Sequence, residues 1–165
     1  MIANRQRRVP VQMQPLEEFA ERALVEMQFP PESVGVEFIS DEVMARLNWK
    51  FRKKRGPTDV LSFPADHEKP SPEAQYVGDI AISPETAQRN ARAGGLDFDE
   101  ELRILILHGM IHLAGFDHET DNGEMEYLEA RLRRRLGLAG RGAKKIPGSK
   151  AASRALSEKS LRNRP

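Results

Sequence analysis

The stretch LRILILHGMIHLAGFDH, from Leu102 to His118, carries three of the four histidines of the chain and begins with its most apolar run. His108 and His112 are four residues apart, so on an α-helix their imidazoles share one face, about 6 Å apart along the axis. Gly115 is placed to end the helix in a left-handed turn, after which His118 can return toward the other two. The spacing predicts a buried helix whose histidines meet at one metal ion.

The ligand types indicate which metal such a site would hold. Three neutral imidazoles with one open coordination position are typical of a catalytic zinc ion, although nickel and copper also accept imidazole. A histidine pair on an apolar helix is often just part of the core, and the pair alone leaves both interpretations open. The third histidine, placed beyond a glycine, favours a site for one Zn²⁺ with His108, His112 and His118 as ligands.

Length and composition indicate one soluble domain. The chain has 165 residues, 39% hydrophobic and 31% charged, and no cysteine. It lacks a signal-like apolar segment and an apolar run long enough for a membrane span, so we expect a cytoplasmic protein with no membrane partner. Residues 140–165 hold eight basic residues and one acid, so this part carries +7 and leaves −6 for the rest of a chain whose net charge is +1. We expect a single catalytic metal-binding domain over residues 1–139 and a basic, disordered tail over residues 140–165.

Hydrophobic periodicity predicts an α+β fold, with a small mixed sheet of about four strands packed against helices and a buried metal-binding helix at its centre. Alternating apolar residues predict strands at 9–13, 34–38, 58–63 and 77–82. Helical spacing and start signals predict helices that begin near Pro15, at Ser40 or Asp41, after Ser83, after Asp97 and near Asp121 to Glu124.

The residue after the first predicted ligand separates this chain from the usual zinc proteases. Their helix reads H-E-x-x-H, where the glutamate is the general base. Position 109 is a glycine here. The helix therefore supplies no base, which tells against peptide hydrolysis by that route.

Three separate segments resemble the YbeY family of bacterial endoribonucleases, the rRNA maturation factors. They are the pattern H-G-x-x-H-L-x-G-x-D-H, the segment NWKFRKKRGPTDVLSFP from Asn48 to Pro64, and Gly78-Asp79-Ile80, in matching order and spacing over roughly residues 34–137. The resemblance implies a zincin-like fold and a zinc ion on the three histidines. It also implies a functional, phosphate-facing Arg52 and cleavage of single-stranded RNA in 16S rRNA 3′-end maturation and ribosome quality control. Phe51 and Phe116 stand where the family commonly has tyrosine.

Arg52 suits a phosphate contact, because a guanidinium is always charged and can bond two phosphate oxygens at once. Without the resemblance, Lys53, Lys54 and Arg55 are equally good candidates. Asp79 lies in a strand interior, where a carboxylate needs a partner. It could orient a ligand histidine, assist a water molecule or bind backbone amides structurally, and we favour a supporting role. Asp117 is a similar candidate, although turn chemistry also explains it.

The leading hypothesis is a zinc-dependent endoribonuclease acting on single-stranded rRNA, with the ribosome or its proteins as partners. An rRNA-binding or ribosome-binding assembly factor with a mainly structural zinc is the main alternative. A metallopeptidase is a third, weakened by Gly109.

Overall fold

The computed structural model describes residues 1–65, 76–116 and 122–138. In these ranges the chain forms one four-stranded sheet and five helices, so the predicted α+β class is confirmed. The predicted ligand His118, the candidate Asp117 and the predicted basic tail lie outside the described residues. None of the described helices has the length and apolar composition needed to cross a membrane.

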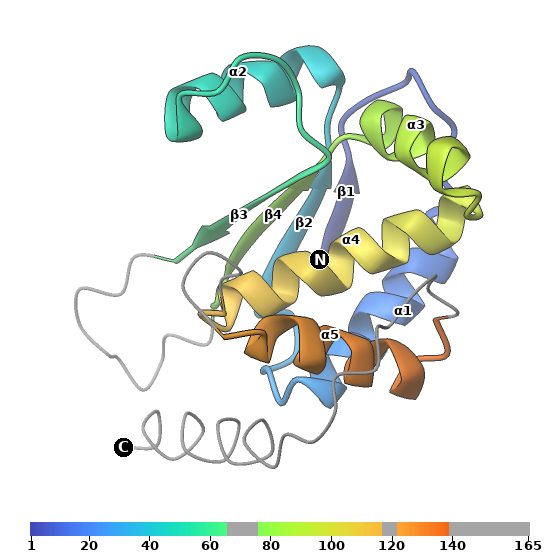
Figure 1. Ribbon diagram of the computed structural model, residues 1–165, viewed down its shortest axis with the longest axis vertical. Coiled ribbons are helices and arrows are strands. Elements are labelled where there is room, and N and C mark those ends of the chain that lie inside the picture. The colour runs from blue at the N-terminus through green and yellow to red at the C-terminus, as the bar shows by residue number, and fades with distance from the viewer. Residues whose placement is uncertain (66–75, 117–121, 139–165) are drawn as a thin grey trace.

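The sheet is mixed, as predicted, with strand order β1-β2-β4-β3. Its strands are β1 (Ile2–Asn4), β2 (Val34–Phe38), β3 (Val60–Pro64) and β4 (Gly78–Ile82). The pairs β1–β2 and β2–β4 are parallel, whereas β3 runs antiparallel to β4 at the edge of the sheet (Figure 1).

The predicted strand over residues 9–13 is wrong, since the first strand is Ile2–Asn4. The side chain of Gln6 accepts hydrogen bonds from the backbone N–H groups of Arg8 and Val9 and donates to the carbonyl of Val9, at 2.7 to 2.9 Å. These local bonds fold the segment into a turn and compete with strand pairing. Met13 then begins the first helix.

The five helices are α1 (Met13–Glu26), α2 (Asp41–Arg52), α3 (Pro84–Gly94), α4 (Phe98–Leu113) and α5 (Glu124–Arg135). Three of the predicted helix starts are confirmed as N-caps whose side-chain oxygens accept backbone N–H bonds, namely Ser40, Ser83 and Asp97. These oxygens satisfy N–H groups that have no partner inside the helix.

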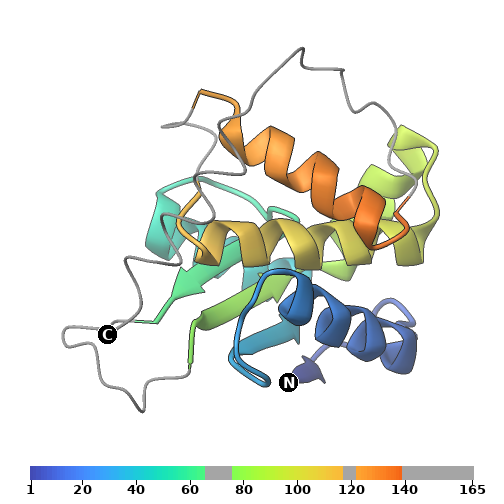
Figure 2. The same cartoon turned by 90° about the horizontal axis from the view of Figure 1, so that it is seen from below.

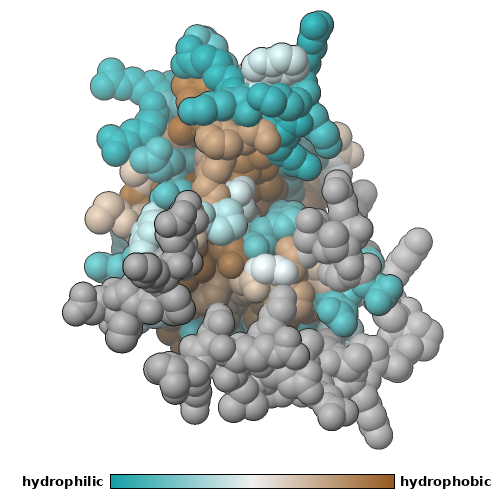
Figure 3. Space-filling model, turned by 90° about the vertical axis from the view of Figure 1, so that its left-hand side faces the viewer, coloured by the Kyte–Doolittle hydropathy of each residue, from teal (hydrophilic) through white to brown (hydrophobic). Residues whose placement is uncertain are grey.

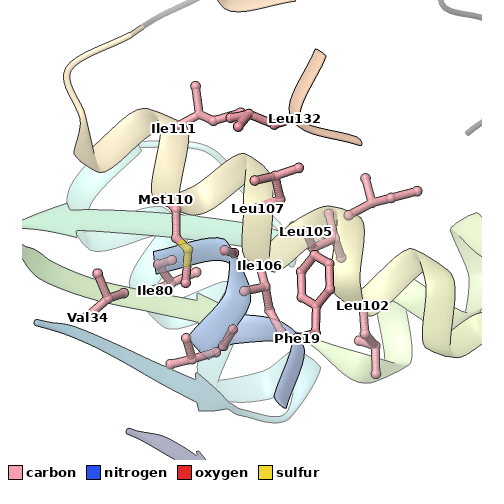
Figure 4. Packing of buried hydrophobic residues seen from close by; sticks show 14 of the residues in the cluster. Phe19, Val34, Ile80, Leu102, Leu105, Ile106, Leu107, Met110, Ile111 and Leu132 are labelled. Atoms are coloured by element: carbon pink, nitrogen blue, oxygen red, sulfur yellow. The ribbon is translucent and has the colours of Figure 1, made fainter. Parts of the chain in front are cut away.

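Helix α4 forms the centre of the main core. It packs on the sheet together with α1, and α5 covers its other side, so α4 lies between α5 and the sheet (Figure 2). In Figure 4, Met110 points toward Ile80 of the sheet, and Ile111 points toward Leu132 of α5. Nine residues of α4 are buried, which fixes the helix that carries the histidines in a rigid environment.

The opposite face of the sheet carries a smaller cluster formed by Ile39, Met44, Leu61 and Ala81, with α2 packed against it. Successive side chains of a strand point to opposite faces. Ile80 belongs to the core on the α4 side and Ala81 to the cluster on the α2 side. Helices α2 and α4 therefore lie on opposite faces of the sheet, as Figure 1 shows.

Candidate metal centre

The two histidines of α4 converge as the four-residue spacing predicts. The Nε2 atoms of His108 and His112 lie 3.0 Å apart, and the ring centroids are 4.6 Å apart with the ring planes at 78°. Both side chains are only partly exposed. Two imidazole nitrogens thus meet at one point beside the C-terminal part of the helix.

This separation fits two ligands of one zinc ion. Zn–N bonds of 2.0–2.1 Å at tetrahedral angles hold two nitrogens roughly 3.3 Å apart, close to the distance between these two Nε2 atoms. The same spacing also suits a hydrogen bond in which Nε2–H of His112 donates to Nε2 of His108. In the described ranges no three histidine, cysteine, aspartate or glutamate side chains gather into a metal-binding group. The third ligand, His118, stays a prediction.

Glu129 of α5 holds His108 from the other side of its ring. Its Oε2 lies 3.0 Å from Nδ1 of His108, and its second oxygen is paired with Arg133. Burial raises the pKa of Glu129, but the hydrogen bond to His108 and the charge of Arg133 outweigh burial, so its pKa lies below the ordinary value. The carboxylate is ionised and can only accept, so Nδ1 of His108 carries the proton and donates it. In this tautomer Nε2 carries the lone pair, on the side of the ring that faces His112.

Sequence reasoning did not single out Glu129. It lies in the apolar stripe of α5, between Met125 and Leu132, and its side chain is only 10% exposed. A carboxylate on the buried face of a helix needs a partner, because burial without one is unfavourable. That signal was present in the sequence, but it does not identify which residue the partner is.

Gly109 faces the sheet and not the histidine pair. A β-carbon at this position would lie 2.7 Å from Cγ2 and 2.8 Å from Cδ1 of Ile80, closer than side-chain carbons approach one another. The glycine therefore allows α4 to pack closely on β4, and its carbonyl accepts a hydrogen bond from Oγ of Ser62 at 3.2 Å. Any longer side chain here, including the glutamate of the protease helix, would have to displace Ile80.

The predicted left-handed turn at Gly115 is confirmed, with φ of +86°. The N–H of Gly115 donates to the carbonyl of His112 at 2.9 Å, and the N–H of Phe116 donates to that of Ile111 at 3.4 Å. Phe116 is buried in the main core, so the ring packs there without needing the hydroxyl of a tyrosine. The chain thus turns sharply at Gly115, three residues before His118.

Asp79 does not orient His108 or His112, which was one of the roles considered for it. It precedes Ile80 in β4, and since Ile80 faces α4, the Asp79 side chain projects from the opposite face of the sheet. There its carboxylate accepts a hydrogen bond from the hydroxyl of Tyr76. Burial and this bond raise the pKa of Tyr76 to about 12, so the phenol stays protonated and donates.

Arg52 is the last residue of α2 and is exposed, on the sheet face opposite the histidine helix. The edge strand β3 lies between the two. On one face of β3, Ser62 bonds to Gly109 of the histidine helix, and on the other the ring of Phe63 contacts Phe51, with centroids 5.0 Å apart. The structure therefore places β3 between the helix that ends at Arg52 and the helix that carries the histidine pair.

Comparison with known proteins shows which family the chain is similar to. The sequence profile of the family described as "Endoribonuclease YbeY" matches residues 1–137. A protein named Endoribonuclease YbeY from Koribacter versatilis is 49% identical over 125 residues, which cover 73% of this chain and 77% of the relative. One of the same name from Geobacter metallireducens is 38% identical over 134 residues, which cover 80% of this chain and 89% of the relative.

A solved structure shares the fold. The solution structure of TM1509 from Thermotoga maritima superimposes with a TM-score of 0.56 at 28% sequence identity. The superposition covers 82% of this chain and 89% of the other. Sequence and structure comparisons thus cover the sheet and the helix that carries the histidine pair.

Proposed function

Because the chain belongs to the YbeY endoribonuclease family, we propose that it is a metal-dependent endoribonuclease that cleaves single-stranded RNA in rRNA processing, including maturation of the 16S rRNA 3′ end. The observation that carries this proposal is the family match over nearly all of the described chain. Such a substrate implies work in the cytoplasm, with the ribosome or its proteins as partners.

The metal part of the proposal rests on the convergence of two ring nitrogens at 3.0 Å. His108, His112 and His118 would hold one Zn²⁺, and α4 would be the metal-binding helix of a zincin-like fold. When bound, zinc supplies a Lewis acid that stabilises charge on a phosphoryl oxygen and lowers the pKa of a water molecule to about 7.

The chain's own residues have distinct tasks in this proposal. Glu129 keeps the proton of His108 on Nδ1, so that Nε2 can act as a ligand. Arg133 pairs with the outer oxygen of Glu129 and compensates its buried charge. Arg52 would bind the scissile phosphate and stabilise the charge that develops on it, because its guanidinium forks to two oxygens. The residue that follows His108 supplies no general base, since position 109, a glutamate in the zinc proteases, is here a glycine packed on Ile80.

The test is cleavage of a single-stranded RNA by three proteins purified in parallel: the wild type, His112→Ala and Arg52→Ala. We expect cleavage by the wild type alone when zinc is present, with at least about a hundredfold loss in each variant, as for removal of a main electrostatic contact. Equal cleavage by all three proteins would reveal a contaminating nuclease and overturn the proposal. Tight RNA binding by a zinc-loaded wild type that cleaves nothing would leave an rRNA-binding assembly factor instead.

A further inference from the structure

The chain exposes two large aromatic rings where α2 ends. Residues 49–57 are all exposed, and among them Trp49 and Phe51 are 53% and 55% exposed. Tryptophan and phenylalanine are usually buried for the most part, so a pair of such rings in one short segment marks a surface that contacts a partner.

The segment that carries these rings is positively charged. Residues 43–58 include six basic residues and no acid. One of the six, Arg46, is paired with Glu42 at 3.2 Å, and the other five are Lys50, Arg52, Lys53, Lys54 and Arg55. A positive segment that also carries aromatic rings is complementary to a polyanion with flat bases, which is the chemistry of a nucleic acid.

The segment is held in a fixed shape. Lys53 adopts a left-handed conformation with φ of 56°, and its N–H donates to the carbonyl of Trp49 at 3.1 Å. The buried side chain of Asn48 donates through Nδ2 to the carbonyl of Gly56 at 2.9 Å, which fastens the following turn to the helix. A preformed turn binds a ligand without the entropic penalty of ordering it.

Helix geometry separates the two rings and puts Arg52 in the interval between them. At 100° per residue, Phe51 lies about 160° around the axis from Trp49, and Arg52 lies about 60° from Trp49 and about 100° from Phe51. Phe51 is supported on one side by the edge contact with Phe63, and Nζ of Lys50 lies 5.2 Å from its ring centroid. Around the end of the helix the positions therefore follow the order Trp49, Arg52, Phe51.

We propose that Trp49 and Phe51 form a base-stacking platform for single-stranded RNA, with Arg52 to Arg55 along the phosphates. This inference rests on the proposed function, because it takes the RNA substrate as the ligand. Figure 3 shows the side of the molecule where α2 ends, with hydrophilic side chains gathered over hydrophobic surface. Unpaired bases present both π-faces, whereas the bases of a duplex are already stacked, so the platform selects single strands. Through β3 it adjoins the helix that bears the histidines.

The chain contains a single tryptophan, so tryptophan emission, excited at a wavelength that the two tyrosines do not absorb, reports on Trp49 alone. We expect a single-stranded oligoadenylate to quench this fluorescence in the full-length wild type, and a double-stranded RNA of equal length to quench it much less. Anisotropy of a labelled oligoadenylate measures binding independently. Binding without quenching would overturn the platform. Quenching by polyglutamate but not by RNA would assign the surface to a protein partner and overturn it too.

Variants separate stacking from charge. Trp49→Leu should weaken oligoadenylate binding about tenfold, and Trp49→Phe should restore most of the affinity, as stacking on an aromatic ring predicts. Replacing Lys54 and Arg55 together by glutamine should lower the slope of log affinity against log salt by about 1.4. The matched pair Arg7→Gln with Arg8→Gln, also exposed, should leave the slope nearly unchanged. Wild-type affinity in Trp49→Leu, or equal slopes in the two charge variants, would contradict the proposal.

Cleavage is measured on the same proteins by gel. If RNA quenches the Trp49 fluorescence of the wild type but is never cleaved, the platform stands and the proposed function is rejected. If the wild type cleaves RNA without any change in Trp49 fluorescence, the proposed function stands and the platform is rejected.

Discussion

The tautomer of His108 depends on one buried carboxylate, that of Glu129, and this dependence can be measured. Glu129→Gln keeps the size of the side chain and an acceptor oxygen, but removes the charge and leaves Arg133 without its ion-pair partner. We expect zinc affinity to fall roughly 10- to 100-fold, the usual effect of losing a group that orients a ligand histidine. Competition with a chromophoric chelator measures it. Glu126→Gln, an exposed position of the same helix, is the control. Equal affinities in both variants would show that Glu129 does not act on the metal.

Gly109 offers a second test, in which a substitution that usually stabilises a helix should destabilise the fold. Glycine to alanine inside a helix normally stabilises by roughly 0.5–1 kcal/mol. At position 109 the added carbon would meet the fully packed Ile80 at 2.7 Å, and overpacking of this kind costs about 1–3 kcal/mol. We expect Gly109→Ala to lower the free energy of unfolding, measured with urea.

The control for that substitution is Gly94→Ala in α3. A β-carbon there would meet nothing closer than Leu96 at 4.0 Å, so this change should stabilise. In an Ile80→Ala background, Gly109→Ala should also become neutral or stabilising. Destabilisation that persists without the Ile80 side chain would mean that another contact opposes the alanine.

Asp79 and Glu129 show how far single residues can be read from sequence. Alternation along β4 puts Asp79 on the face opposite Ile80, but the sequence does not tell which of the two faces α4 covers, so its distance from the histidine pair could not be predicted. The role of Glu129 could not be derived, because it joins residues 21 positions apart on two helices. Their contact depends on how α5 docks on α4. The histidine pair was predictable because its geometry lies within one helix.

At the level of elements, α2 and α3 are joined at their N-termini by Asp41. Its carboxylate accepts bonds from Ser83 at 2.5 Å and from Thr86 and Arg89 at 2.7 Å. Burial raises the pKa of Asp41, but these three partners lower it more, so it lies below the ordinary value. A depressed pKa stabilises the fold above the unfolded value of about 3.9, and this stabilisation is lost as the pH falls through the folded value.

Asp41→Asn should therefore cost about 1–2 kcal/mol at pH 7, the scale of hydrogen bonds to a charged group. The difference from wild type should begin to shrink once the pH falls below about 4, because the unfolded wild type then takes up a proton at this carboxyl. It should be lost below the lowered pKa of the folded state, where the folded carboxyl is protonated too. Urea unfolding at a series of pH values measures both. The control is Glu42→Gln, the next residue, whose ion pair with Arg46 is exposed and contributes below about 0.5 kcal/mol. A difference of the same size at pH 3 and pH 7 would mean that the charge of Asp41 is irrelevant.

Elements with local signals were predicted well, and those that depend on distant partners were not. The caps at Ser40, Ser83 and Asp97 act within their own first turns, so the helix starts could be read directly. Strand β1 has three residues and pairs only with β2, more than 30 positions away. Three residues give too little alternation to recognise, and the pattern at residues 9–13 was stronger than the true strand.

Over the whole molecule, the sheet has unequal faces. The α4 side holds the main core, with nine buried residues in α4 alone, whereas α2 buries only Met44 and Asn48 on the other side. Periodicity predicted both helices and the buried character of α4. It did not predict which face each helix covers, because that depends on the strand order β1-β2-β4-β3.

This inequality predicts that α2 opens without the rest of the fold. Native-state hydrogen exchange should give α2 amides an opening free energy at least about 2 kcal/mol below that of α4 amides, which exchange only through global unfolding.

Two variants test this difference between the helices. Ile106 of α4 is fully buried, and Ile106→Val should lower the free energy of global unfolding by about 1 kcal/mol. Since α4 stays folded while α2 opens, the exchange of α2 should not change in this variant. The packing of Met44 is lost both when α2 opens alone and when the whole domain unfolds. Met44→Ala should therefore accelerate exchange in α2 and α4 alike. If Ile106→Val accelerated both helices equally, the domain would unfold as one cooperative unit despite its unequal faces.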